Sequence, residues 1–130
     1  RKAMDIMRPG ILLKELNREV GAFWEEEHVK LGLYSLMDLK NQSERNPLWN
    51  KFYWHGTSHS IGIDVHDPFD HSIPLQAGMV MSCEPGIYIP EERTGIRLEN
   101  DMLITNDAAI NLSGSLPIDP DHIEEIMSKT

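Results

Sequence analysis

The sequence has 130 residues, a single cysteine and a formal net charge of −9 at pH 7. That length accommodates one domain with one core, and a hydrophobic fraction of 40% is ordinary for a globular protein. The acidic charge argues against a nucleic-acid partner, because phosphates bind basic surfaces. The lone Cys83 excludes an intramolecular disulfide framework and fits a reducing, cytoplasmic compartment. No apolar run reaches the ~20 residues of a membrane span, so we expect no membrane partner.

Helices are predicted from apolar spacing at both ends of the chain. Arg1–Met7 resembles the end of a helix, which suggests that the chain is a fragment of something longer. The next helix follows Pro9-Gly10 and runs to about Leu31, where Gly32 would end it. Its apolar stripe recurs every three or four residues: Leu12, Leu16, Val20 and Phe23. A last helix is expected at about His122–Ser128, after an Asp119 cap.

Several other residues receive a structural interpretation. Glu25–Glu27 and His28 are expected on the solvated face of the long helix. A short helix near Met37 is followed by a polar loop. The aromatic segment Leu48–Trp54 is interpreted either as core or as the apolar wall of a substrate pocket.

Histidines cluster in the segment Trp54–Asp67, which holds three of the six in the sequence: His55, His59 and His66. Imidazole binds borderline metals and transfers protons near neutral pH, so this segment is a candidate functional site. The alternative is a polar, solvated strand end. Apolar residues alternate with polar ones here and predict a half-buried strand: Ile61, Ile63 and Val65. Asp64 and Asp67 add carboxylates, whereas Asp70 and His71 are expected on a surface loop.

Further strands are predicted downstream at Met79–Glu84, Ile87–Ile89 and Gly95–Thr105. The first ends at Pro85-Gly86, and its Cys83 is expected to be a buried small hydrophobe. On the last strand, alternation places three charges on one face: Arg97, Glu99 and Asp101. Such a face is usually solvated, and burying it would require ion pairing or a metal.

Three stretches in this order resemble the pita-bread metallopeptidase family, which includes aminopeptidase P, prolidase and methionine aminopeptidase. The stretches are His55-Gly-Thr-Ser-His59 with Asp64-Val-His66-Asp67, Gly78-Met-Val-Met-Ser-Cys-Glu84-Pro85-Gly86, and Gly95-Ile-Arg97-Leu-Glu99-Asn-Asp101. They span most of the chain, and the first is most similar to aminopeptidase P, with prolidase next. The resemblance implies an α+β fold with an antiparallel sheet and flanking helices. Residues 1–130 would be the C-terminal portion of the catalytic domain.

The resemblance also implies roles for individual residues. His59 and Glu84 would be metal ligands, and Glu99 would bridge both ions of a dinuclear centre. His66 and His55 would be catalytic and would also contact the substrate, together with Arg97. Manganese is the expected metal, with cobalt, zinc or iron as alternatives. Strand parity places His59 and His66 on opposite faces, so a bend at Gly62 is needed to bring both to one cavity.

The chain departs from the family pattern before its first motif. The family supplies two aspartate ligands and a further histidine from upstream, but only 58 residues precede His59 here. The aspartates among them, Asp5 and Asp38, do not lie in the family's strand pattern. We therefore expect three of five metal ligands, a half-built site and an exposed sheet edge, which predicts an inactive fragment and a homo-oligomer.

The activity implied by the resemblance is that of a Xaa-Pro aminopeptidase. This is a metal-dependent exopeptidase that removes the N-terminal residue from peptides with proline second. The alternatives are a prolidase, which cleaves dipeptides, and a non-catalytic module that binds peptides or proteins. The presence of His59, Glu84 and Glu99 together favours the enzyme, since a binding module has no physical need of all three.

Overall fold

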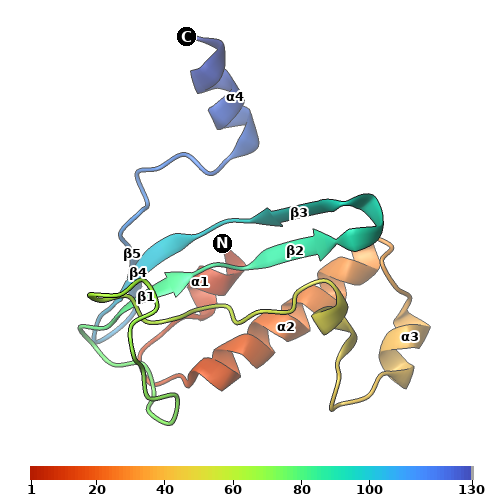
Figure 1. The fold of residues 1–130 in the computed structure, drawn as a ribbon, viewed down its shortest axis with the longest axis horizontal. Coiled ribbons are helices and arrows are strands. Elements are labelled where there is room, and N and C mark those ends of the chain that lie inside the picture. The colour runs from red at the N-terminus through yellow and green to blue at the C-terminus, as the bar shows by residue number, and fades with distance from the viewer. Residues whose placement is uncertain (130) are drawn as a thin grey trace.

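The computed structural model describes residues 1–129 as helices packed below a curved antiparallel ribbon (Figure 1). The helical elements are α1 (Lys2–Ile6), α2 (Leu13–Lys30), α3 (Leu36–Asn41), α4 (Pro120–Ser128) and the 3₁₀ turns η1 (Leu48–Lys51) and η2 (Pro90–Glu92). The strands are β1 (Val80–Cys83), β2 (Gly86–Ile89), β3 (Thr94–Arg97), β4 (Asn100–Ile104) and β5 (Ala109–Asn111). None of the helices in this described range is long and apolar enough to cross a membrane.

The long helix α2 forms where its apolar spacing predicts it. Its first turn is capped by the Glu15 carboxylate, which accepts a hydrogen bond of 3.1 Å from the backbone N–H of Leu12. It ends at Gly32, whose φ of 74° is left-handed, and the N–H of Leu33 donates back to the carbonyl of His28. The predicted stop is therefore confirmed.

The core lies between α1, α2 and the ribbon. Leu16 and Val20 of α2 face Met81 and Ile104 of the sheet, and all four are at most 2% exposed. Burying each such side chain stabilises the fold by roughly 2 kcal/mol. Gly21 lets η1 approach α2, because a Cβ there would lie 2.4 Å from the Trp49 ring.

The aromatic segment Leu48–Trp54 divides between the two predicted roles. Phe52 and Tyr53 are buried and support the core interpretation, whereas Trp54 is exposed and stacks on Tyr88 with 4.7 Å between ring centroids. The prediction for His28 is wrong. Its ring is fully buried and stacks on Trp24 with 5.0 Å between ring centroids. His28 lies on a side of α2 that turns towards the aromatic residues, although three glutamates precede it in the sequence.

The strands form one ribbon with a gap in the middle. β1 pairs with β4, β2 pairs with β3, and the same register holds on both sides of the gap. The expected strand Gly95–Thr105 is thus two elements, because pairing lapses at Leu98 and Glu99. Pro85 contributes to the lapse, since it has no N–H to donate to the ladder. β5 pairs with β4 and completes the larger sheet.

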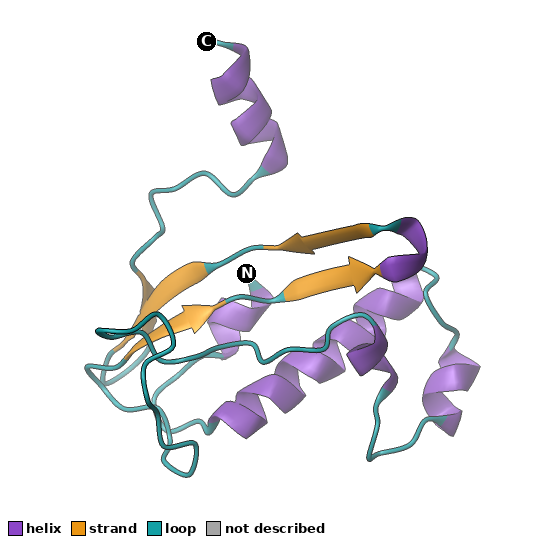
Figure 2. Cartoon of the chain, viewed as in Figure 1, coloured by secondary structure: helices purple, strands orange, loops and turns teal. Residues whose placement is uncertain are grey.

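The predicted strand at Ile61–Val65 is wrong. Residues 62–66 bend away from the sheet, and Ile63 is fully exposed. The segment that does run along β1 lies slightly earlier: Ser82 and Glu84 donate their backbone N–H groups to the carbonyls of His59 and Thr57, each at 2.9 Å. Figure 2 shows this stretch as part of the long loop before β1. The alternation of apolar and polar residues does not show that the backbone pairing of this segment with β1 ends at Ile61.

The last helix forms as predicted and lies apart from the rest. Asp119 accepts a hydrogen bond of 3.2 Å from the N–H of His122, which is the expected cap. The connecting segment carries α4 away from the ribbon (Figure 1), and none of its described residues is buried. It takes no part in forming the site.

Candidate metal centre

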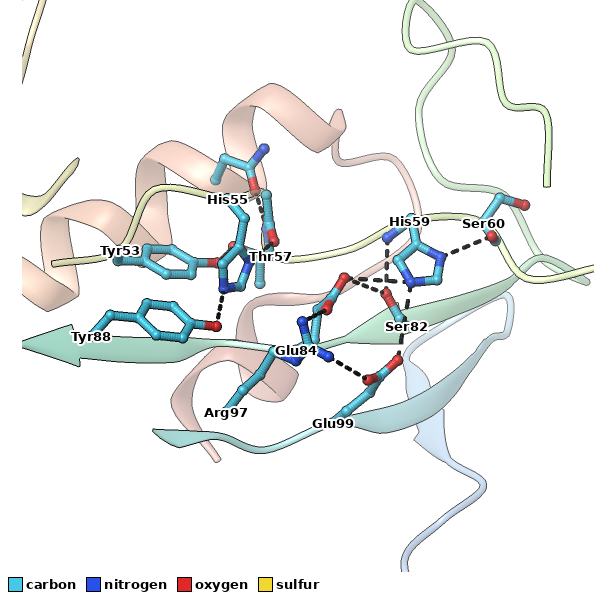
Figure 3. Close-up of polar contacts among 12 residues, drawn as sticks. Tyr53, His55, Thr57, His59, Ser60, Ser82, Glu84, Tyr88, Arg97 and Glu99 are labelled. Carbon is cyan, nitrogen blue, oxygen red and sulfur yellow. Dashed lines mark hydrogen bonds and ion pairs between the residues drawn. The ribbon is translucent and has the colours of Figure 1, made fainter. Parts of the chain in front are cut away.

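The gap in the ribbon places two carboxylates opposite each other. The register on either side of the gap sets Glu84 across from Glu99. Both project to the same face of the ribbon as Arg97 (Figure 3). The Glu84 side chain is 12% exposed and the Glu99 side chain is 40% exposed. The predicted charged face is exposed to solvent, and its Arg97 and Glu99 lie beside the histidine-rich segment.

His59 reaches the two carboxylates from the extended segment beside β1. Its Nε2 lies 3.4 Å from Glu84 Oε1 and 4.0 Å from Glu99 Oε1. Its Nδ1 lies 3.0 Å from the carbonyl of Ser60, which can only accept a hydrogen bond. Nδ1 therefore donates a hydrogen bond to this carbonyl, and Nε2 is the ring nitrogen turned towards the carboxylates. A metal-binding histidine is oriented in the same way, with one ring nitrogen held by a carbonyl and the other turned to the metal.

These three residues fit a divalent metal by their chemistry. One ligand atom from each of His59, Glu84 and Glu99 can be chosen so that all lie within 4.8 Å of one another. Nitrogen and carboxylate donors suit manganese, zinc, cobalt and iron. Among the described residues 1–129, no other group of three or more histidine, cysteine, aspartate or glutamate side chains comes this close together.

Ser82 is a residue of the site that the sequence does not single out. Its side chain is fully buried, and its Oγ accepts a hydrogen bond of 2.9 Å from the backbone N–H of His59. The same Oγ donates to Glu84 Oε1 at 3.4 Å. One hydroxyl thus links the imidazole-bearing segment to the carboxylate. Strand alternation from Glu84 places Ser82 on this face, but it does not reveal the hydrogen bond between Ser82 and the backbone of His59.

Arg97 holds the two carboxylates by charge. Its guanidinium lies 3.5 Å from Glu84 Oε2 and 4.0 Å from Glu99 Oε2. The Arg97 side chain is half exposed, so these are weak ion pairs that orient the carboxylates more than they stabilise the fold. The family resemblance implies a place for Arg97 in the substrate pocket; in the structure its contacts are to the carboxylate oxygens of Glu84 and Glu99.

His66 approaches the centre through the bend expected at Gly62. The rings of His59 and His66 are 4.2 Å apart in an edge-to-face arrangement. The loop between them is closed by the N–H of Asp67, which donates to the carbonyl of Ser60. A side chain at Gly62 would collide with the Asp67 carboxylate, because its Cβ would lie 2.5 Å from Oδ2. Glycine therefore permits the turn that returns His66 to His59.

His55 lies earlier in the same histidine-rich segment and is held by Tyr88. His55 Nδ1 lies 2.8 Å from the Gly56 carbonyl, so it carries the proton, and the Tyr88 hydroxyl donates to Nε2 at 2.7 Å. The loop is anchored below by Thr57, whose N–H donates to Asn17 Oδ1 at 2.8 Å. The sequence predicted His55 but missed Tyr88 and Asn17, because their partners lie more than thirty positions away.

The remaining acidic and thiol candidates have local roles. Asp38 caps α3 by accepting from Ser35, and Asp70 accepts from Ser72 at the surface. His71 is exposed, as predicted. Cys83 is 1% exposed, and burial raises the pKa of its thiol to about 12, so it stays protonated as a small hydrophobe. That prediction is confirmed.

Comparison with known proteins agrees with this geometry. Rat Xaa-Pro aminopeptidase 3 is 43% identical over 91 aligned positions, which cover 62% of this chain and 18% of that protein. Xaa-Pro aminopeptidase of Escherichia coli is 36% identical over 139 aligned positions, which cover 96% of this chain and 31% of that protein. A structure of zinc-substituted E. coli aminopeptidase P in complex with product matches with a TM-score of 0.82 and 34% identity, covering 98% of this chain and 31% of that one.

Two conclusions follow from these matches. The chain spans less than a third of the length of the E. coli enzyme that it matches, so the relatives carry a large portion that has no counterpart here. The structural match over nearly the whole chain shows the pita-bread α+β fold that the motifs imply. Residues 1–106 match metallopeptidase family M24. The chain therefore belongs to metallopeptidase family M24.

Proposed function

We propose that this chain is the C-terminal portion of the catalytic domain of a Xaa-Pro aminopeptidase that uses two divalent metal ions. The observation that carries the proposal is the convergence of His59 Nε2 with the carboxylates of Glu84 and Glu99. The similarity to Xaa-Pro aminopeptidases supports the substrate class, a peptide with proline in second position. Manganese is the proposed metal, and zinc, cobalt and iron have the same donor preferences at this site.

Each residue of the site has a role in this proposal. When bound, the cations supply an activated water and polarise the carbonyl of the scissile bond. His59, Glu84 and Glu99 would hold these cations, with Glu99 as the ligand proposed to be shared by both. His66, whose ring packs against His59, donates a hydrogen bond to the oxygen on which charge develops.

Substrate positioning falls to residues beside the metal ligands. His55, fixed by Tyr88, lines the pocket for the proline ring. Arg97 orients the Glu84 and Glu99 carboxylates and faces the same pocket. The exposed ring of Trp54, stacked on Tyr88, extends an apolar wall of the kind that peptide pockets use.

The isolated chain should lack this activity. Its sole aspartates before His59 lie in α1 and α3 and do not join the group of His59, Glu84 and Glu99, and Asp38 is engaged in capping. The upstream portion of the relatives would supply the missing oxygen ligands. We propose a cytoplasmic protein that binds neither nucleic acid nor membrane, in accordance with its acidic charge and single cysteine.

The test compares two proteins. The 130-residue chain is loaded with manganese, dialysed to remove free metal and analysed for metal by mass spectrometry. It should retain little metal and cleave no Xaa-Pro peptide. A longer protein that contains the upstream portion should cleave tripeptides with proline second. Preference for Xaa-Pro dipeptides would indicate the prolidase alternative. Tight binding of two ions by the isolated chain would contradict the assignment of three ligands, and binding without cleavage by the longer protein would favour a non-catalytic module.

A further inference from the structure

The loop of residues 60–67 carries His66 away from the sheet and returns it to His59. Its start is fixed on β1, because His59 bonds to that strand through its carbonyl and Ile61 bonds to it through its N–H. Bonding direction alternates along an extended segment, so the backbone groups of Ser60, which lies between these two residues, face away from β1. The Ser60 carbonyl therefore offers the loop an acceptor in a fixed position.

Two hydrogen bonds converge on the Ser60 carbonyl. One comes from His59 Nδ1 at 3.0 Å and orients the imidazole of the proposed metal ligand (Figure 3). The other comes from the backbone N–H of Asp67 at 3.2 Å and closes the loop one residue after His66. A carbonyl oxygen has two lone pairs and can accept both bonds. One oxygen thus fixes both ends of the loop, and the rings of His59 and His66 lie 4.2 Å apart.

The Asp67 side chain bonds the backbone of the same loop. Its Oδ1 accepts a hydrogen bond of 3.2 Å from the N–H of Asp64, whose carbonyl accepts in turn from the N–H of Gly62 at 3.2 Å. The carboxylate also lies so close to Gly62 that a Cβ there would be 2.5 Å from Oδ2. Asp67 is half-buried, whereas residues 62–66 are all exposed. Its carboxylate therefore lies on the inner side of the turn.

We propose that Asp67 is a positioning residue for His66, because its carboxylate holds the loop closed and keeps the His66 ring against His59. The inference rests on the proposed function, in which His66 contacts the oxygen that develops charge. Residues 62–66 are exposed and irregular, so a loop without this carboxylate would sample many conformations. A ring displaced by about 1 Å loses much of its interaction with the transition state.

Nuclear magnetic resonance of the 130-residue chain tests the positioning without reference to catalysis. In Asp67→Ala, the amide protons of residues 64 and 67 should exchange with solvent several-fold faster, because the hydrogen bonds that protect them are lost or loosened. Magnetisation transfer between the ring protons of His59 and His66 should disappear. Asp67→Asn keeps an acceptor oxygen and should restore both signals. Unchanged exchange and unchanged ring contact in Asp67→Ala would overturn the proposal.

Asp70→Ala is the matched control for these measurements. The Asp70 carboxylate also stabilises a local turn, since it accepts hydrogen bonds of 2.9 and 2.7 Å from the N–H and the hydroxyl of Ser72. Its removal should leave the exchange of residues 64 and 67 and the histidine ring contact as they are. The same changes in Asp70→Ala as in Asp67→Ala would show general loosening of the loop and would overturn a specific role for Asp67.

Gly62→Ala perturbs the same contact from the other side. The added methyl group would displace the Asp67 carboxylate, so this variant should reproduce the effects of Asp67→Ala. In the double variant the carboxylate is already gone, and the methyl group should have no further effect. Effects that add in the double variant would show that Gly62→Ala acts through another contact, and would overturn the place of the carboxylate in the turn.

Kinetics of the longer enzyme test what the positioning does. Asp67→Ala should lower kcat ~10- to 100-fold, with bound metal and the KM for a Xaa-Pro tripeptide unchanged, and Asp67→Asn should recover most of the rate. In a His66→Ala background, Asp67→Ala should cause no further loss, because no ring remains to be positioned. A further loss in that background, or loss of metal, would overturn the proposal. An unchanged kcat in His66→Ala alone would reject the proposed role of His66, while the exchange and ring contacts would still decide whether Asp67 positions it.

Discussion

The buried Ser82 hydroxyl accepts a hydrogen bond of 2.9 Å from the backbone N–H of His59, which ties the histidine-rich segment to β1. The same hydroxyl donates to the Glu84 carboxylate. A side chain that is already held in place loses less conformational entropy when it binds a metal ion, so support of this kind strengthens metal binding. The contact explains how a segment without regular secondary structure presents His59 in a fixed place.

Replacing Ser82 by alanine should weaken metal binding in the longer enzyme ~10-fold or more, since outer partners of metal ligands typically contribute 10–100-fold. Ser82→Thr, which keeps the hydroxyl, should restore most of the affinity. Ser58→Ala is a matched control, because the Ser58 hydroxyl is buried without a hydrogen-bond partner among the described residues. Competition with a chelating dye measures the dissociation constant. Equal affinity in all three variants would show that Ser82 does not position the ligands.

Glu99→Ala in the longer enzyme should lower activity by ~10³-fold or more, because it removes a principal electrostatic element of the site. Bound metal should fall at the same time. Glu92→Ala, in the exposed turn η2, is the control and should leave both quantities unchanged. The assignment of Glu99 fails if the variant keeps its metal and nearly full activity in the same assay.

His66→Ala should separate substrate contact from metal binding. If His66 acts on the substrate, metal content should hold while kcat falls, since the lost interaction is made mainly in the transition state. His71→Ala, on the exposed loop, should change neither. Metal analysis and steady-state kinetics on the same preparation decide the point. Loss of metal from the His66 variant would mean that His59 and His66 have exchanged roles.

Acid should destabilise the fold through His28. Burial lowers the pKa of this imidazole from 6.5 to about 4, so the folded protein keeps it neutral. The unfolded chain takes up a proton below its ordinary pKa. The stability associated with neutral His28 is therefore complete above pH ~6.5 and is lost as pH falls towards 4. Between pH 7 and pH 5 the loss should be about 2 kcal/mol.

Urea unfolding at the two pH values measures this effect against His28→Phe. The phenyl ring suits the aromatic surroundings of Trp24, Tyr34 and Phe52 and cannot take up a proton. Other groups titrate equally in both proteins, so the difference between them isolates His28. An identical pH dependence in the two proteins would show that the buried ring does not carry the acid sensitivity.

Much of the fold follows from short-range patterns in the sequence. The stripe of Leu16 and Val20 predicts α2, Gly32 predicts its end, and Asp119 predicts the cap of α4, because each depends on neighbours within one or two helical turns. The resemblance of the three motifs to the family points to His59, Glu84 and Glu99 as well. Their convergence was not deducible from spacing alone, since it depends on how two strands align across the gap.

The errors arise where distant contacts override local pattern. The alternation at Ile61, Ile63 and Val65 is typical of a strand. The segment nevertheless leaves the sheet, because its backbone pairing with β1 ends where the N–H of Ile61 donates to the carbonyl of Val80. His28 follows three glutamates and looks solvated, yet the rings that bury it come from residues 24, 34 and 52. A pattern within one segment carries no information about which aromatic residues will cover it.

The unbroken register of the ribbon has an evolutionary consequence. Glu84 and Glu99 are opposite each other only because equal numbers of residues lead from each to the turn at η2. Losing a single residue between the gap and that turn would rotate Glu99 onto the apolar face, since side chains alternate along a strand. Descendants of this chain can therefore vary the hairpin tip freely in length and sequence. They cannot change the length of one arm alone.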